Sequence, residues 1–197
     1  MEPFETVADE ARQCTLCQPF LDHPVRPVLT GSSRARIRLV GQAPGTRVQA
    51  SGKPFTDPSG ERLRAWMGVS EAEFYNPDIL AITPMGFCFP GLDAKGGDKP
   101  PRKECAPLWQ SRCTQALPDV ELTLLIGQYA QRWYLAERAC KTLTETVSHW
   151  RNAWPKYVAL PHPSWRNNAW LKRNPWFEQD VLPVLQKRIR SILANEV

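Results

Sequence analysis

The stretch from Ile37 to Gly60 reads IRLVGQAPGTRVQASGKPFTDPSG. Residues 37–40 form a short, mostly apolar run, which is the length of a buried strand. The glycines and the proline of residues 41–45 (GQAPG) then force a tight turn. Open α/β folds bind ligands where a strand ends in such a turn. Taken alone, however, the stretch is more typical of an ordinary connection from a strand to a helix.

Three further apolar runs alternate with segments of helical character, and this alternation indicates the fold. Near-continuous apolar strands are typical of a parallel sheet that is covered on both faces. The sequence therefore predicts an α/β fold: a three-layer α/β/α sandwich with a four-stranded parallel sheet, in a single domain over residues 1–197. The expected strands are Arg36–Gly41, Asp78–Thr83, Leu122–Gly127 and Tyr157–Leu160.

Two helix boundaries are also expected from the sequence. Ser59 has the character of an N-cap for a helix that runs to Met67. A last helix over about Trp176–Ala194 contains Pro183, and a proline inside a helix predicts a kink or a break.

The composition indicates an ordinary globular protein with a moderately basic charge. Charged residues make up 23% of the chain and hydrophobic residues 42%, and the net charge is +5. No apolar run has the length of a membrane span and the N-terminus does not resemble a signal peptide, so we expect a soluble, cytoplasmic protein, as a monomer.

The tract from Trp150 to Arg190 is the most basic part of the chain. It carries eight Lys and Arg residues against two acidic ones, with five tryptophans interleaved. Basic side chains attract phosphates and aromatic ones stack on bases, so the tract favours a nucleic-acid partner. The alternative is a solvated helix face with its tryptophans in the core.

The chain has six cysteines: Cys14, Cys17, Cys88, Cys105, Cys113 and Cys140. In an intracellular protein, cysteines favour metal binding or plain burial over disulfides. The loop from Met85 to Arg102 is long for a compact domain, and such loops are usually functional or tied down by a metal.

Several short motifs occur along this chain in the same order as in a known protein family. They are GQAPG at residues 41–45, GKPF at 52–55 and HPS at 162–164, together with the Cys-x-x-Cys of residues 14–17. In this order the motifs resemble the uracil-DNA glycosylase superfamily, most closely its iron–sulfur, family 4 type. The chain departs from the family pattern at Gln42, where a glutamate is usual, and at Pro84, where an asparagine usually ends the second strand.

The resemblance implies roles for residues around the strand ends. A flipped base would stack on Phe55, and His162 would donate a hydrogen bond to the departing base, as an oxyanion hole does. Gln42 would orient water, and it would bind the base together with Ala43. The remaining expected substrate contacts are Thr83 and Ser164. The alternatives are that Phe55 is a core residue and that His162 caps a turn.

Asp57 is the carboxylate nearest to Phe55 in the sequence. It is a candidate for stabilising the sugar cation or activating water. An N-cap role before residues 58–60 is an equally good interpretation, because aspartate is common in caps.

The resemblance also implies a DNA contact and a metal centre. Trp165, Arg166 and Asn167 follow the HPS motif, where the family inserts a loop into the minor groove. A [4Fe–4S] cluster would be bound by Cys14, Cys17, Cys88 and Cys105. Zinc is the alternative metal, and free thiols are the alternative to any metal. We expect Cys113 and Cys140 to be free, although Cys113 could substitute as a ligand.

The predicted function is that of a monofunctional DNA glycosylase, an enzyme that hydrolyses the N-glycosidic bond of a flipped deaminated base such as uracil. One alternative is a protein of the same fold that binds damaged or single-stranded DNA without cutting it. Another is an unrelated small-molecule hydrolase, which would bind DNA weakly and with little dependence on salt.

Overall fold

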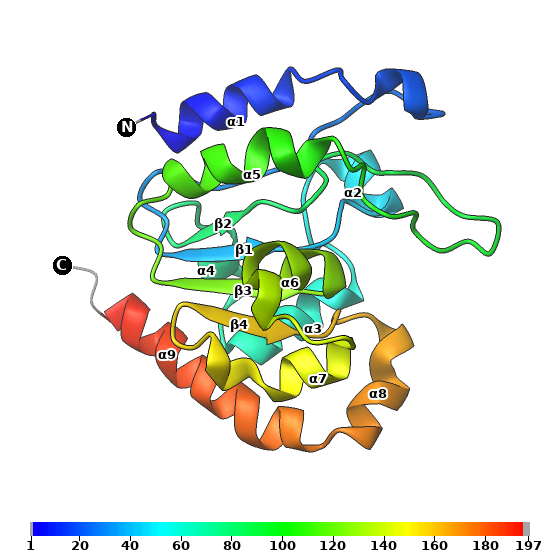
Figure 1. Ribbon diagram of the computed structural model, residues 1–197. Coiled ribbons are helices and arrows are strands. Elements are labelled where there is room, and N and C mark those ends of the chain that lie inside the picture. Colours follow the sequence, from blue (N-terminus) through cyan, green and yellow to red (C-terminus); the bar gives the residue numbers. More distant parts are fainter. Residues whose placement is uncertain (1, 195–197) are drawn as a thin grey trace.

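The computed structural model describes residues 2–194, and its centre is a four-stranded sheet (Figure 1). The strands are β1 (Ile37–Val40), β2 (Leu80–Ile82), β3 (Leu122–Ile126) and β4 (Tyr157–Leu160). All neighbouring strands are parallel and the order is β2-β1-β3-β4. Ile37 of β1 is in register with Leu80 of β2 and with Leu122 of β3. The four strands expected from the sequence are confirmed.

Helices cover both faces of this sheet and make the three-layer α/β/α sandwich that the sequence predicts (Figure 1). One layer contains α1 (Phe4–Arg12), α5 (Cys105–Gln115) and α6 (Gln128–Leu135). The opposite layer contains α3 (Pro58–Met67), α4 (Glu71–Tyr75) and α9 (Leu182–Ala194). Helix α7 (Leu143–Ser148) packs against β4. No helix in residues 2–194 is long and apolar enough to cross a membrane.

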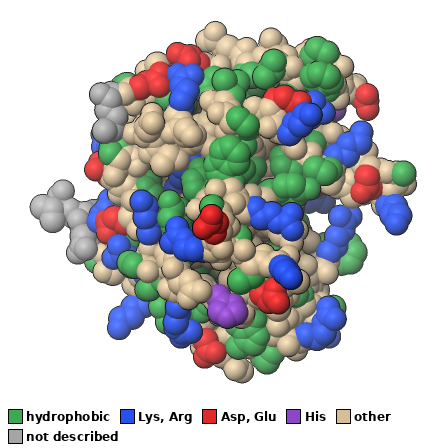
Figure 2. All heavy atoms as spheres, in the orientation of Figure 1, with side chains coloured by type: hydrophobic (Ala, Val, Ile, Leu, Met, Phe, Trp, Pro, Cys, Tyr) green, Lys and Arg blue, Asp and Glu red, His purple; other side chains and the backbone are tan. Residues whose placement is uncertain are grey.

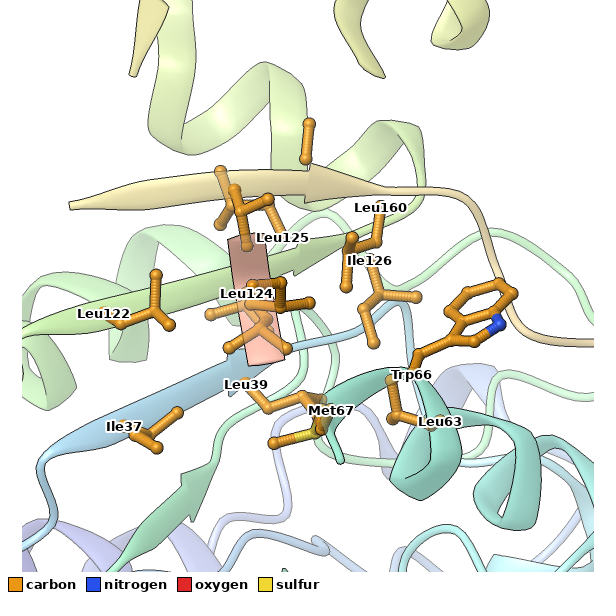
Figure 3. Packing of buried hydrophobic residues seen from close by; sticks show 14 of the residues in the cluster. Ile37, Leu39, Leu63, Trp66, Met67, Leu122, Leu124, Leu125, Ile126 and Leu160 are labelled. Carbon is orange, nitrogen blue, oxygen red and sulfur yellow. The ribbon is translucent and has the colours of Figure 1, made fainter. Parts of the chain in front are cut away.

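Successive residues of β1 point to opposite faces of the sheet. Ile37 and Leu39 point toward α3, where Leu63 and Met67 pack against them (Figure 3). This packing follows from the two-residue period of a strand, which sends successive side chains to opposite faces. The residue between them, Arg38, therefore points into the other layer.

Three local features differ from the sequence-based expectation or refine it. A short helix, α2 (Thr46–Ser51), occupies part of the stretch expected to be loop. The N-cap of α3 is Asp57 rather than Ser59, because the Asp57 carboxylate accepts the N–H of Gly60 and a proline can occupy the first helical position. The break expected near Pro183 is a π-helical turn at Phe177–Val181, directly before α9.

Arg38 is buried in the sheet, with 2% of its surface exposed. Its guanidinium donates to Thr83 Oγ1 at 2.7 Å, Thr114 Oγ1 at 2.7 Å and Gln110 Oε1 at 2.8 Å. The ring centroid of Tyr134 lies 5.2 Å from its Cζ atom. All these partners are neutral, so hydrogen bonds and the aromatic face compensate the loss of water around the charge.

We expect Arg38→Ala to lower the free energy of unfolding by about 3 kcal/mol, because it empties the centre of this network and leaves buried hydroxyl and amide groups without their partner. Urea denaturation would measure the change. Arg12→Ala, which removes an exposed ion pair with Asp9, is the control and should leave the midpoint nearly unchanged. An equal, small effect of both substitutions would contradict the structural role of Arg38.

Candidate active site

A cavity of about 260 Å³ opens at the carboxyl edge of the sheet, beside the ends of β1, β2 and β4. Such an edge is the usual ligand site of open α/β sheets. The segments that follow β1 and β4 and the loop that follows β2 all contribute to its lining. The polar or aromatic side chains among the lining residues are Gln42, Thr46, Arg47, Phe55, Asp57, Ser59, Asp98 and His162.

Phe55 is held in the cavity wall by an unusual backbone. Its φ angle is 56°, in the left-handed region that residues with a side chain rarely adopt. The Tyr75 hydroxyl donates to its carbonyl at 3.0 Å and Arg64 donates to the same oxygen at 3.3 Å. Gly60 makes this possible, because a Cβ there would lie 1.8 Å from the Phe55 oxygen. Backbone strain of this kind is concentrated at functional sites.

His162 follows β4 and presents a defined tautomer. The backbone N–H of Ser164 donates to its Nδ1 atom at 3.2 Å, so in the neutral ring Nδ1 carries the lone pair and the proton is on Nε2. Burial lowers the pKa of His162, and the nearby carboxylates of Asp57 and Asp98 oppose this effect. The imidazole is thereby favoured as a neutral N–H donor beside the cavity.

Gln42 and Asp57 both line the cavity, and both already have a structural partner. The side-chain amide of Gln42 donates to the carbonyl of Lys99 at 3.3 Å. The Asp57 carboxylate accepts the N–H of Gly60 at 3.2 Å, at the start of α3. Ala43, between the turn glycines, also lines the cavity. Asp57 therefore caps α3, as one of the two interpretations expected. Its carboxylate also lies in the cavity lining, where the other interpretation, a role in stabilising a sugar cation or activating water, requires it.

Asp98 is a cavity residue that the sequence analysis missed. It lies in the long loop between β2 and α5, and its carboxylate oxygen Oδ2 is 3.6 Å from where a Cβ of Gly45 would be. Desolvation at the cavity mouth raises the pKa of Asp98, while the positive charge of Arg166 lowers it. A polar, glycine-rich loop has no periodicity that would mark one of its aspartates in advance.

Two expected substrate contacts do not line the cavity. Thr83 is fully buried and accepts the hydrogen bond of Arg38, so its hydroxyl points into the layer of α5 and α6. Ser164 orients His162 through its backbone, and its hydroxyl accepts the N–H of Arg166 at 3.2 Å. The Thr83 side chain is thus engaged in the buried network, and its role as a substrate contact stays a prediction. Its partner Arg38 lies 45 residues away in the sequence.

The segment after His162 is exposed next to the cavity. Trp165, in a short turn of 3₁₀ helix (Trp165–Asn167), has 72% of its surface exposed, and Arg166 is exposed beside it. Asn167 donates to the carbonyl of His162 at 2.7 Å, which makes it a support for the loop. A large exposed aromatic side chain next to a cavity is a feature of binding surfaces.

The other four tryptophans of the basic tract are buried or half-buried and belong to the core or pack against it. Lys and Arg side chains are scattered among apolar and acidic ones on the face that Figure 2 shows, rather than gathered in one patch. The core interpretation therefore holds for most of the tract, and Trp165 is its exposed exception.

Four cysteines meet at a second, much smaller cavity of about 20 Å³ under α1 and α5. Its lining includes Cys14, Cys17, Cys88 and Cys105, whereas Cys113 lies on the buried face of α5, in the core. Burial raises the pKa of the Cys88 thiol to about 11 and that of Cys105 to about 12. Within residues 2–194, no three His, Cys, Asp or Glu side chains are close enough together to count as a metal-binding group.

We expect Gly60→Ala to lower the free energy of unfolding by about 2 kcal/mol or more, because the new methyl group would overlap the Phe55 carbonyl and force the backbone apart. Tyr75→Phe, which removes only one hydroxyl donor to that carbonyl, should cost about 1 kcal/mol. Chemical denaturation would measure both. A Gly60→Ala protein as stable as the parent would contradict the close approach of α3 to Phe55.

Comparison with known proteins places this geometry in a family. The sequence model of the Uracil DNA glycosylase superfamily matches residues 29–186. The type-4 uracil-DNA glycosylase of Saccharolobus solfataricus is 27% identical over 88 residues, which are 43% of this chain and 41% of that protein, so the match spans less than half of its length. The solution NMR structure of a candidate uracil DNA glycosylase from Methanosarcina acetivorans has a TM-score of 0.46 and 14% identity, covering 81% of this chain and 94% of the other. Since residues 29–186 include all four strands and nearly every part of the cavity, this chain belongs to the Uracil DNA glycosylase superfamily.

Proposed function

We propose that this protein is a DNA glycosylase that hydrolyses the N-glycosidic bond of a flipped, deaminated base such as uracil. The observation that supports this most strongly is the pairing, in one cavity, of an aromatic wall at Phe55 with a neutral His162 that presents Nε2–H. A cavity of about 260 Å³ lies just below the range of about 300–1,000 Å³ that is typical of drug-sized ligands, so it suits one base better than a whole nucleotide.

Base recognition combines stacking with backbone contacts. Extruding a nucleotide costs a few kcal/mol, and stacking of the base on Phe55 offsets part of that cost. The turn at Gly41–Gly45 brings backbone close to the base, because glycine at both ends leaves room for a planar ligand. Pro84 lies in the lining at the end of β2, where the family usually has an asparagine that reads uracil, so this chain has no amide side chain at that position to read the base.

The chemical step requires charge stabilisation on both sides of the bond. As the C1′–N bond breaks, the electron pair leaves with the base, and His162 donates its Nε2–H to a base oxygen as negative charge develops there. Asp57 contributes negative charge near the sugar, which becomes cationic. Water then attacks C1′ to give an abasic sugar and a free base. No lysine lines the cavity within the described chain, which favours water over a Schiff-base intermediate.

DNA outside the cavity would contact the segment after His162. Trp165 is exposed, so it can fill the space that the flipped base leaves in the stack. Arg166 beside it can pair with a phosphate.

The four cysteines that share the small cavity are proposed to bind a [4Fe–4S] cluster. Thiolates are the ligands of such clusters, and four cysteines from three segments of the chain line this cavity, which supports the fit of the donor set. The present cavity is of the size of one water molecule, so cluster binding would have to move the α1–α5 segments apart. A cluster would supply a cross-link between the N-terminal segment and α5.

The test of the enzymatic proposal is a panel of oligonucleotides that carry uracil, hypoxanthine, xanthine or a mismatch, assayed by cleavage of the abasic product. On the best substrate, His162→Ala should lower the single-turnover rate by a factor on the order of 10² to 10³, because one donor to the leaving base is lost. DNA affinity should change little, because this interaction strengthens only in the transition state.

His149→Ala is the matched control, since His149 caps α7 and does not line the cavity. If the parent protein binds these oligonucleotides but cleaves none, the alternative of a non-catalytic DNA-binding protein is favoured. Full activity of His162→Ala would remove that residue from the mechanism.

The cluster proposal predicts that protein purified without oxygen is brown and contains about four irons per chain, with the broad absorbance of thiolate-bound iron. Cys88→Ser should lower the iron content and the thermal stability together, while Cys113→Ser should leave the iron content unchanged, because Cys113 lies outside the shared cavity. Elemental analysis would measure the iron content of each variant, and thermal denaturation would measure its stability. Zinc in place of iron would indicate the alternative metal, and neither metal would indicate free thiols.

A further inference from the structure

The loop between β2 and α5 contains a compact hairpin that reaches the mouth of the active-site cavity. Leu92 and Asp98 pair across it, and the N–H of Lys99 donates to the carbonyl of Gly91 at 2.9 Å. Inside the turn, Asp93 Oδ1 accepts the backbone N–H groups of residues 95 and 97 at 2.8 and 2.9 Å. The hairpin therefore holds Asp98 in a defined place, as a tight turn does.

Gln42 attaches this hairpin to the first motif of the site. Its side-chain amide donates to the carbonyl of Lys99, the residue after Asp98, at 3.3 Å. The Asp98 carboxylate also lies close to the turn of this motif, because its Oδ2 atom is 3.6 Å from the position of a hypothetical Cβ on Gly45, an ordinary van der Waals distance. Gln42, which replaces the family's usual glutamate, thus supplies no carboxylate itself. Its hydrogen bond to Lys99 instead holds the neighbouring Asp98 carboxylate at the cavity.

Asp98 and Asp57 differ in whether their carboxylate oxygens already accept a hydrogen bond within the protein. Asp57 accepts the N–H of Gly60 as the cap of α3. Asp98 has no side-chain hydrogen bond to any residue in the range 2–194, and its electrostatic neighbours are His162, Arg166, Asp57 and Asp93. A free carboxylate that lines the cavity can accept a proton or face a developing cation.

Asp98 lies at the mouth of the cavity, where the sugar of a flipped nucleotide would be, rather than deep inside, where the base would be. Asp98 is exposed at the mouth and close enough to Arg166 to feel its charge, and Arg166 lies on the surface that would meet DNA. A base that enters the cavity leaves its deoxyribose at the mouth. The carboxylate is therefore near the place where the sugar becomes cationic and where water attacks.

We propose that Asp98 is the carboxylate that acts on the attacking water and the sugar cation, and that Gln42 is a positioning residue that holds the Asp98 hairpin over the cavity. This inference rests on the proposed glycosylase function. In the step, the C1′–N bond breaks and its electron pair leaves with the base, and the water oxygen then bonds to the cationic C1′. Asp98 accepts the water proton and releases it to solvent, and the base anion takes up a proton.

The test is a set of single-turnover rates on the best oligonucleotide of the panel, with enzyme in saturating excess. Asp98→Asn should lower the rate by a factor on the order of 10², because the amide cannot accept the proton. Asp93→Asn is the control in the same hairpin. An asparagine oxygen can still accept both turn N–H groups, so the rate should stay within about twofold of the parent.

Two further variants separate chemistry from structure. Added formate should restore part of the rate to Asp98→Ala, because a small carboxylate can occupy the vacated space; a merely structural aspartate would not be rescued. Gln42→Glu should lower the rate, since a carboxylate cannot donate to the Lys99 carbonyl, and amide hydrogen exchange at residues 91–99 should become faster. A direct role of position 42 in water activation predicts the opposite, a faster enzyme with unchanged exchange.

The outcomes distinguish the two proposals. A parent protein that cleaves no oligonucleotide overturns the glycosylase function and the role of Asp98 with it. An active parent with an Asp98→Asn rate within about threefold overturns only the assignment of Asp98, and leaves Asp57 as the carboxylate of the site.

Discussion

The guanidinium of Arg38, buried in the sheet without a carboxylate partner, is the constraint on which much of this structure depends. A buried charge is tolerated only when its donors are satisfied, so the groups around it must be in place together. Gln110 illustrates this: its Oε1 accepts from Arg38 and from Tyr134, while its Nε2 donates to the carbonyl of Pro84 at 2.7 Å. One network therefore joins β1, the end of β2, α5 and α6.

The same network shapes both candidate sites. Pro84 lines the candidate active-site cavity, and its carbonyl accepts a hydrogen bond from Gln110, so the network reaches the cavity wall at the end of β2. Helix α5, which supplies Gln110 and Thr114, begins at Cys105, one of the four cysteines around the small cavity. If the proposed cluster moves α5, that movement would act on the buried hydrogen bonds of Arg38, and through them on the wall of the larger cavity.

Much of the fold could be predicted because parallel strands that are covered on both faces consist of short apolar runs, and glycine and proline end them. Helix α2 could not, since its six residues bury no side chain and show no apolar period. The N-cap of α3 is Asp57, two residues before the expected Ser59. The sequence does not reveal this, because Pro58 fits the first position of a helix as well as a turn.

The sequence by itself determined which segments follow the strands, and hence that Gln42, Phe55, Asp57 and His162 would meet at one edge of the sheet. Only the tertiary structure decided which of their side chains are free to act. The Gln42 amide donates to a carbonyl 57 residues away, and the Thr83 hydroxyl accepts a hydrogen bond from Arg38. Asp98 lines the cavity from a loop that has no recognisable sequence pattern. The physical reason is that strand ends follow from local apolar patterns, whereas hydrogen-bond partners and burial depend on residues that are distant in the chain.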